Sequence, residues 1–367
     1  MGIKDIFVPQ KQSRSTMVQL PTRQANNFDL LRILFAWFVI VSHSYVLNGG
    51  GATDPLFEMT QQTFLFSFIG VKGFFIISGY LIFKSMMVST SIFEYLVKRV
   101  LRIFPALAVV LLVTLAAVYF IYPTNIPPFF SNKEVYAYFL GNIILFKPHF
   151  FISGIFSGLP SAAINGSLWT IEYEFFFYLF ILLFFFIRAQ KKQLIIALSV
   201  VVVLFLVVRL FFYDWTVQTH FFIPLEPLFD LGPYFLMGSL FSCFDFDSMP
   251  AKNVIAAFLF VTLAASVYCK VGHTVVYFTL PFLVIYVGKQ TSKLATWVHD
   301  KLGDPSYGIY LYAFPLQQLL IYWYRPSTLM LFISSTLGAF VFGYLSWILI
   351  EKKALALKQY FLQVRHK

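Results

Sequence analysis

The sequence has little charge and few cysteines. Only 12% of its 367 residues are charged, whereas a soluble domain carries about 25%. The apolar fraction is 59% and includes 47 phenylalanines, more than a soluble core of this length could bury. Two cysteines, Cys243 and Cys269, are too few for a disulfide framework or a metal cluster, so we interpret both as packing residues and predict no metal site. The composition excludes an ordinary soluble protein.

Long apolar runs are what the sequence has instead. The tract 194–212 is long enough to cross about 30 Å of hydrocarbon, which takes roughly 20 apolar residues. A membrane barrel would show alternating strands of about ten residues between turns, and the uninterrupted runs argue against one. We therefore predict an all-α, polytopic transmembrane helical bundle with about ten spans. The spans are expected at 28–48, 64–86, 103–121, 167–187, 194–213, 228–244, 254–269, 273–288, 305–324 and 328–350.

The basic residues predict how these spans are oriented. The net charge is +11, but the basic residues lie in short clusters beside apolar segments, so we expect no nucleic-acid partner. With ten spans, 20 of the 27 Lys and Arg residues fall in or beside cytoplasmic segments and four fall outside. An eleventh span at 135–151 would place the cluster at 188–192 outside, so that segment is predicted as a buried or re-entrant helix. This bias predicts a bacterial inner-membrane protein with both termini in the cytoplasm.

The domain organisation predicted from these patterns is simple. A polar N-terminal tail, 1–27, precedes the transmembrane domain, 28–351, and a basic tail, 352–367, follows it. No apolar run precedes Phe28, so the first segment is predicted as a cytoplasmic tail rather than a signal peptide. Any chemistry is then expected on polar residues embedded in the apolar helices.

The first predicted span contains an embedded histidine. Asp29 and Arg32 are three residues apart and are expected to neutralise each other at the cytoplasmic boundary. His43 follows about 16 Å further along the helix, deep in the membrane, where an ionisable side chain indicates a functional site. A packing histidine bonded to a neighbouring helix is the alternative.

The second predicted span contains a group of small residues, and the third begins with two basic residues. Small residues around Ser78 would allow close helix approach. Arg99 and Arg102 lie three residues apart at the predicted cytoplasmic mouth of the third span. Their fork geometry suits the phosphates of an anionic cofactor, although the positive-inside rule alone would also explain them.

The fourth predicted span begins with two carboxylates. Glu172 and Glu174 lie in its first turns, and Glu174 shares a face with Tyr178. Glu174 is expected about 10 Å below the outer surface, at a level that His43 also reaches. The two are therefore a candidate pair in which the carboxylate orients the base.

These motifs, taken together, resemble the acyltransferase-3 family of membrane O-acyltransferases. The resemblance rests on Arg32-x10-His43, Phe74-Phe75 to Ser78-Gly79, Arg99-x2-Arg102 with Pro105, Ser167 to Thr170 leading into Glu174, and Gly303 to Tyr312 with Tyr307. It covers nearly the whole chain. It implies a cytoplasmic acyl-CoA donor, most simply acetyl-CoA, with no permanently bound cofactor. It also implies a glycan or lipid-linked glycan hydroxyl as acceptor and His43 as the catalytic residue.

The expected mechanism follows from that resemblance. Arg99 and Arg102 bind the donor phosphates, and His43 acts as general base or carries the acyl group, with Glu174 beside it. Asp29 and Arg32 hold the first helix in register, and Ser78, Glu172, Tyr178 and Tyr307 line the site.

The sequence departs from the family pattern at two positions, and two other functions stand as alternatives to this mechanism. Lys72 stands where relatives often have an acid, and Phe314 where many have a histidine. No appended hydrolase-like domain is recognised, so the protein is expected to act alone or with a partner enzyme. A secondary transporter and a non-catalytic membrane scaffold are the alternatives.

Overall fold

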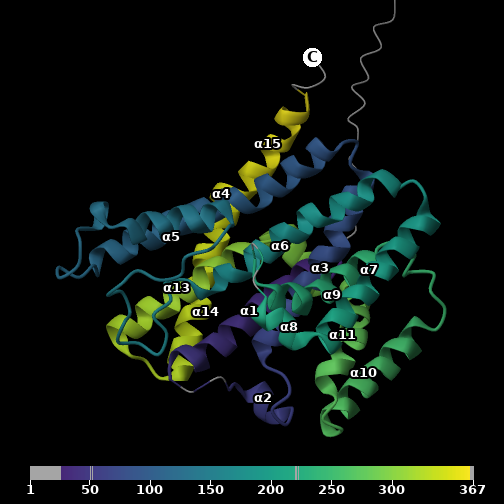
Figure 1. Cartoon of the computed structure of the whole chain (residues 1–367), viewed down its shortest axis with the longest axis horizontal. Helices are drawn as coiled ribbons and strands as arrows, with labels where there is room; N and C mark the ends of the chain where they lie inside the picture. The colour runs from purple at the N-terminus through teal and green to yellow at the C-terminus, as the bar shows by residue number, and fades with distance from the viewer. Residues whose placement is uncertain (1–25, 50, 52, 220, 222, 364–367) are drawn as a thin grey trace, which may run out of the picture.

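The computed structural model describes residues 26–49, 51, 53–219, 221 and 223–363, and within them every regular element is a helix (Figure 1). The predicted tail 1–27 lies outside the described residues except for its last two. The end of the predicted basic tail, 364–367, also lies outside them. The all-helical fold class is confirmed.

Each predicted span is helical in the structure. Among the residues that the structure describes, six helical segments are long and apolar enough to cross a membrane, namely 28–47, 66–88, 92–120, 166–187, 191–211 and 328–358. The protein is therefore a multi-span helical bundle, and the count of ten spans is not confirmed. The helices that correspond to the predicted spans are α1 (Phe28–Leu47), α3 (Phe66–Val88), α4 (Ile92–Phe120), α6 (Trp169–Phe180), α7 (Lys191–Phe211), α9 (Leu225–Phe241), α10 (Lys252–Tyr268), α11 (Gly272–Lys289), α13 (Ser306–Tyr324) and α14 (Thr328–Ser346).

Shorter elements connect these helices. The 3₁₀ turns η2 (Gly166–Leu168) and η3 (Ile181–Ile187) extend α6 at both ends. The others are η1 (Phe129–Ser131), α2 (Pro55–Met59), α5 (Lys133–Ile144), α8 (Tyr213–Gln218), α12 (Lys293–Trp297), the π-helical turns η4 (Val298–Leu302) and η5 (Trp347–Glu351), and α15 (Lys352–Gln363). Figure 1 shows α15 lying along the first part of α4, at one side of the bundle.

Helix α4 begins eleven residues before the predicted span. The Ser91 hydroxyl caps it by accepting a hydrogen bond from the Glu94 backbone N–H, and the Glu94 carboxylate accepts one from the Thr90 N–H. These reciprocal bonds satisfy backbone donors that a helix start leaves unpaired. Arg99 and Arg102 therefore lie within α4, in the part that precedes the predicted span.

Helices α3 and α9 cross closely at the centre of the bundle. A Cβ atom on Gly79 would collide with the Phe235 carbonyl, and one on Gly238 would collide with the Ile76 carbonyl. The Ser239 hydroxyl donates a hydrogen bond to the Gly79 carbonyl across this contact, at 3.2 Å. The close helix approach predicted from the small residues near Ser78 is confirmed, because only glycine lets the two backbones come this near.

The segment between α4 and α6 enters the bundle at a different place from the one predicted. Helix α5 confirms a helix within 135–151, but it ends at Ile144 and exposes Tyr136 and Leu140. The mostly buried stretch is instead 163–168, an irregular chain that ends in the 3₁₀ turn η2 and whose Asn165 amide donates a hydrogen bond to the Leu311 carbonyl. Helix α6 therefore starts inside the bundle rather than at its surface.

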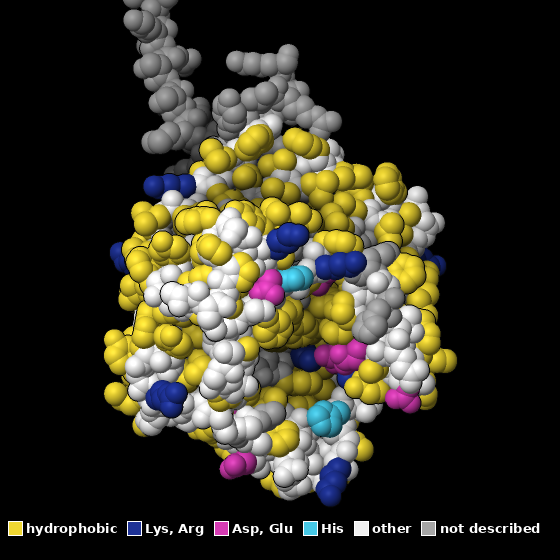
Figure 2. Space-filling model, turned by 60° about the vertical axis from the view of Figure 1, so that its left-hand side comes forward, with side chains coloured by type: hydrophobic (Ala, Val, Ile, Leu, Met, Phe, Trp, Pro, Cys, Tyr) yellow, Lys and Arg dark blue, Asp and Glu magenta, His cyan; other side chains and the backbone are white. Residues whose placement is uncertain are grey.

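The two ends of the bundle are distinguished by the helix ends that meet there. At one end, here named the basic end, the start of α1 meets the end of α11 through the Asn27 N–H and the Gly288 carbonyl, and the end of α3 meets the start of α4. At the opposite end, the Asn48 amide at the end of α1 donates a hydrogen bond to the Pro326 carbonyl. Figure 2 shows a face that is mostly hydrophobic, with a hollow near its centre where basic and acidic side chains gather.

Candidate active site

The two charged residues of the first helix pair with other helices rather than with each other. Asp29 contacts the His299 Nδ1 at 2.7 Å, and the Arg32 guanidinium binds Asp304 at 2.5 Å. The predicted ion pair between Asp29 and Arg32 is therefore wrong. Their spacing permits a local pair, but partners about 270 residues away in the chain satisfy each charge instead. Both residues still anchor the start of α1 at the basic end, as expected.

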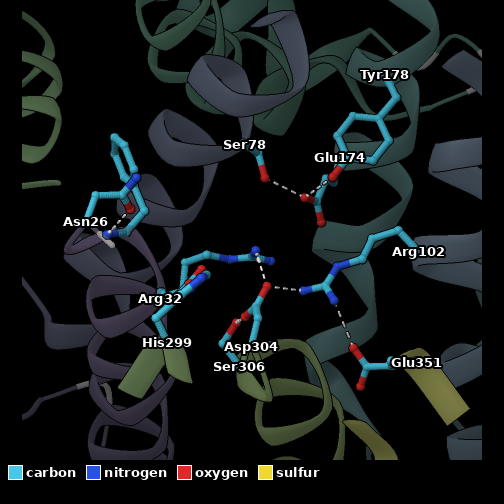
Figure 3. A network of polar contacts seen from close by, with 12 residues as sticks. Asn26, Arg32, Ser78, Arg102, Glu174, Tyr178, His299, Asp304, Ser306 and Glu351 are labelled. Atoms are coloured by element: carbon cyan, nitrogen blue, oxygen red, sulfur yellow. Dashed lines mark hydrogen bonds and ion pairs between the residues drawn. The ribbon is translucent and has the colours of Figure 1, made fainter. Parts of the chain in front are cut away.

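Arg32, Arg102, Asp304 and Glu351 form an ion cluster at this end, which we name the carboxylate cluster (Figure 3). The Arg102 Nη2 lies 2.5 Å from Asp304 and its Nη1 lies 3.1 Å from Glu351. The Glu351 side chain is fully buried and also accepts a hydrogen bond from Ser346. Because both terminal nitrogens of Arg102 already bind carboxylates, its fork is occupied.

The charge state of Asp304 follows from this cluster. Burial would raise the pKa of its carboxyl, but the guanidinium groups of Arg102 and Arg32 outweigh burial and lower the pKa to about 2. The Ser306 hydroxyl donates a further hydrogen bond to the carboxylate at 2.5 Å. Asp304 is therefore ionised at any physiological pH and holds two arginines from two different helices.

Arg99, three residues before Arg102, has a different environment. Its Nε is buried without a hydrogen-bond partner among the described residues, and its Nη2 contacts the Ser85 hydroxyl at a long 3.4 Å. The guanidinium also lies over the rings of Tyr95 and Tyr178, each at 5.7 Å. Arg99 therefore retains donors that a ligand could use.

Arg99 faces a large cavity, which we name the basic chamber. Its volume is about 730 Å³, and the residues that line it include six Lys or Arg side chains but no carboxylate. Arg32, Lys98 and Arg102 pair with carboxylates that do not line the cavity, and the other three cations add positive charge without such a pair among the described residues. A cavity of this size with this charge suits a large anionic ligand. The basic side chains are Arg32, Lys84, Lys98, Arg99, Arg102 and Lys358.

Glu174 lies next to the basic chamber and binds two residues that line it. Its carboxylate accepts hydrogen bonds from the Ser78 hydroxyl at 2.6 Å and from the Tyr178 hydroxyl at 2.5 Å (Figure 3). Ser78 and Tyr178 line the basic chamber, whereas Glu174 lines a narrow cavity of about 30 Å³ next to it. Arg32 lines both spaces. The structure brings Ser78, Glu174 and Tyr178 together, and Tyr307 lines the narrow cavity with Glu174 and Arg32.

His43 lies on the other side of the narrow cavity. It lines a third cavity of about 250 Å³, which we name the histidine cavity, and this shares Val71 and Tyr310 with the narrow one. The His43 Nδ1 is buried without a hydrogen-bond partner among the described residues, and the ring packs edge-on against Phe314 at 5.1 Å. His43 lines this cavity, and a buried ring nitrogen without a partner calls for a functional explanation.

The predicted pairing of His43 with Glu174 is not present in the structure. Gly166 packs against Phe314, which contacts His43, so the start of the α6 segment lies near the level of the histidine. Glu174 follows eight residues later, about 12 Å further toward the basic end. The estimate from sequence assumed that the helix begins at the outer surface, whereas the buried chain 163–168 moves its start inward.

Glu172 turns away from Glu174. Its carboxylate accepts a backbone hydrogen bond from Lys147, in the segment between α5 and α6, and its Oε1 has no partner among the described residues. Residues two apart on a helix point in different directions, so Glu172 does not share the narrow cavity with Glu174. Glu172 lines none of the three cavities described above, so no contact supports its predicted lining role.

A second ion network lies beside the histidine cavity, and analysis of the sequence did not find it. Lys72 lines that cavity and binds Asp230 of α9 at 2.5 Å. Asp230 also accepts a hydrogen bond from the Tyr277 hydroxyl at 2.7 Å and contacts Arg209 of α7 at 3.3 Å. The available signal was the presence of charged residues inside three apolar segments. The same signal marks Glu351 in the carboxylate cluster.

The described residues contain no group of three or more His, Cys, Asp and Glu side chains that could hold a metal ion. At His43 the site offers a group suited to acid–base or nucleophilic chemistry, and cations line the basic chamber.

A bundle of apolar helices with a charged chamber at one end and an embedded histidine facing a cavity toward the other has the features of a multi-pass membrane enzyme. The family model described as an acyltransferase domain matches residues 26–349. The chain therefore belongs to the acyltransferase-3 family and is an O-acyltransferase.

Two curated relatives are similar to this chain. An O-acetyl transferase of Shigella phage Sf6 is 31% identical over 352 residues, which cover 90% of this chain and 96% of the relative. Nodulation protein 10 of Rhizobium leguminosarum bv. viciae is 48% identical over 84 residues, covering 23% of this chain and 22% of that protein. No solved structure matches the chain.

Proposed function

We propose that the protein transfers an acetyl group from acetyl-CoA, bound at the basic end, to a hydroxyl of a cell-surface glycan that approaches His43 from the opposite end. The observation that carries this proposal is the series of three cavities, in which neighbours share Arg32 and then Val71 and Tyr310. We name this series the passage. The choice of acetyl rests on the name of the phage relative, which is an O-acetyl transferase.

The basic chamber is the proposed donor site. Coenzyme A carries several phosphate charges, and six cations line this chamber. Of the two arginines predicted to bind phosphate, Arg99 has the free donors, whereas Arg102 binds Asp304 and Glu351. Arg99 is therefore the main proposed phosphate ligand, and Arg102 shapes the chamber wall. The thioester then points along the passage toward His43.

The histidine cavity is the proposed acceptor site. As the acceptor oxygen attacks the thioester carbonyl carbon, His43 takes the hydroxyl proton, and it returns that proton to the thiolate when the carbon–sulfur bond breaks. If His43 carries the acyl group instead, its nitrogen attacks first, the thiol leaves, and the acceptor hydroxyl then releases the histidine. Both routes yield an ester and free coenzyme A.

Glu174 has a positioning role in this proposal. It does not reach His43, but it binds Ser78 and Tyr178 where the basic chamber meets the narrow cavity. Tyr178 in turn lies under the Arg99 guanidinium. Glu174 therefore holds the wall along which the thioester arm passes.

The proposed orientation places the basic end in the cytoplasm of a bacterial inner membrane, because Lys and Arg residues gather on the cytoplasmic side of membrane proteins. The donor then comes from the cytoplasm, and the glycan or lipid-linked glycan comes from the other side.

The test is a reaction with purified protein in detergent and acetyl-CoA labelled in the acetyl group. We expect thioester cleavage with label on a glycan acceptor or on the protein, and we expect both to disappear in His43→Ala. Phe314→Leu serves as the control, since it alters packing around His43 without removing an ionisable group. Equal cleavage by wild type and His43→Ala would contradict the proposal.

A further inference from the structure

The narrow cavity joins the two ends of the passage and is far smaller than either neighbour. It holds about 30 Å³, against about 730 Å³ in the basic chamber and about 250 Å³ in the histidine cavity. A single water molecule needs about 10–15 Å³ of such space, so the narrow cavity accommodates only a few atoms. Whatever passes between thioester and acceptor has to fit this volume.

The wall of the narrow cavity is mainly aromatic and aliphatic. Phe74 of α3 meets Tyr310 of α13 edge-to-face, with ring centroids 5.7 Å apart, and Val71 lies one turn before Phe74. Phe74 also packs against Phe35, at 6.1 Å. We name Val71, Phe74 and Tyr310 the collar.

The collar is held in place on its Tyr310 side. The Tyr310 hydroxyl lies 2.7 Å from the Thr170 hydroxyl and 3.0 Å from the Ser167 carbonyl, and the side chain is buried. These bonds tie α13 to the start of the α6 segment, so the ring cannot swing aside without leaving buried polar groups unpaired. The cavity therefore has a fixed width at Tyr310.

We propose that the collar selects the acyl chain, so that the protein accepts an acetyl group and rejects longer linear acyl groups. This inference rests on the proposed function, because it assumes that the thioester reaches the narrow cavity. The acyl carbonyl lies beside the Tyr310 and Thr170 hydroxyls, and the methyl group fills the space against Val71 and Phe74. Each further methylene then overlaps the collar.

The expected size of the selection follows from known pockets. One methylene more or less in an apolar site changes kcat/KM by about 10–200-fold. Wild-type protein should therefore use acetyl-CoA at least about 10-fold better than propionyl-CoA and at least about 100-fold better than butyryl-CoA.

The experiment compares initial rates of thioester cleavage with acetyl-, propionyl- and butyryl-CoA. Phe74→Val enlarges the collar from one side, and Val71→Ala enlarges it by a smaller, better tolerated change. Phe38→Val is the matched control, because Phe38 is also half-buried but packs against Phe66 rather than lining the passage. Retention volume in gel filtration verifies that each variant is folded.

We expect the acetyl-to-butyryl ratio to fall at least about 10-fold in Phe74→Val and less in Val71→Ala, while Phe38→Val keeps the wild-type ratio. If Phe74→Val does not fold, Val71→Ala decides alone. A wild type that uses butyryl-CoA as well as acetyl-CoA, or collar variants with the wild-type ratio, would overturn the inference and leave the proposed function standing. A folded wild type that cleaves none of the three thioesters would contradict the proposed function itself.

Discussion

The carboxylate cluster lies beside the basic chamber, where the passage begins, and the polar groups of the cluster and of the passage are arranged in opposite ways. In the cluster, Arg102 has a carboxylate on each terminal nitrogen, and Asp304 binds two arginines. Along the passage, the Arg99 Nε and the His43 Nδ1 have no partner among the described residues. Paired buried charges hold helices together, whereas unpaired buried polar groups are retained where a ligand binds. We therefore expect the carboxylate cluster to stabilise the fold and the passage to bind and convert the substrates.

Breaking the cluster should have the largest effect. Asp304→Asn leaves Arg32 and Arg102 without their shared carboxylate, and removing one partner of a buried ion pair destabilises a protein by about 3–5 kcal/mol. We expect a lower midpoint of thermal unfolding in detergent. Asp300→Asn, four residues earlier and exposed, is the control. An Asp304→Asn protein as stable as wild type would show that the cluster does not hold the helices.

Removing His43 should affect activity without affecting stability. His43→Ala is expected to lose acetyl transfer by at least about 100-fold, the usual effect of losing a general base, while its unfolding midpoint and acetyl-CoA affinity stay near wild type. Rates of label transfer and equilibrium binding measure the two properties separately. Transfer at near wild-type rates would make His43 a packing residue.

Acidification offers a test of the cluster without mutation. The pKa of Asp304 is lowered to about 2 in the folded protein, from 3.8, so its stabilising effect is full above about pH 4 and is lost as pH falls toward 2. The shift corresponds to about 2 kcal/mol. The stability difference between wild type and Asp304→Asn should therefore shrink as pH falls from about 4 toward 2. A stability difference that does not change with pH would show that the ionised Asp304 carboxylate is not the source of the stabilisation.

Removing Arg99 should have the smallest effect and should appear in donor binding. A hydrogen bond to a charged group contributes about 1.5–3 kcal/mol, so Arg99→Ala should weaken acetyl-CoA binding about 10-fold or more without a matching loss of stability. Lys252→Ala also removes one positive charge, but outside the basic chamber, so it controls for the change in the overall charge of the protein. If Arg99→Ala and Lys252→Ala bind acetyl-CoA equally well, Arg99 does not bind the donor and only contributes to the orientation of the protein in the membrane.

Sequence patterns predicted the helices well because apolar length is a local property. Each predicted span is helical, and the glycine contact between α3 and α9 was expected from the small residues near Ser78. The clustering of Ser78, Glu174 and Tyr178 is also present. The helices and the Glu174–Tyr178 pair depend on neighbours within one or two turns of a helix, whereas the contact of Ser78 with Glu174 joins two helices.

Partners far apart in the chain were not predictable. Arg32 has a possible local partner in Asp29, and nothing in the spacing indicates that Asp304 binds it instead. The depth of Glu174 was misjudged because the buried chain 163–168 has no periodic pattern that marks it as part of the bundle. The division of roles between Arg99 and Arg102 likewise depends on Glu351, which lies 249 residues beyond Arg102.

The central claim is that the donor enters the passage only from the basic end, which the proposed orientation places in the cytoplasm. Membrane vesicles of the two opposite orientations can test it, because acetyl-CoA does not cross the bilayer. When acetyl-CoA is added outside, inside-out vesicles should cleave it and right-side-out vesicles should not, and opening the latter with detergent should restore cleavage. Cleavage by intact right-side-out vesicles and none by inside-out vesicles would contradict the account.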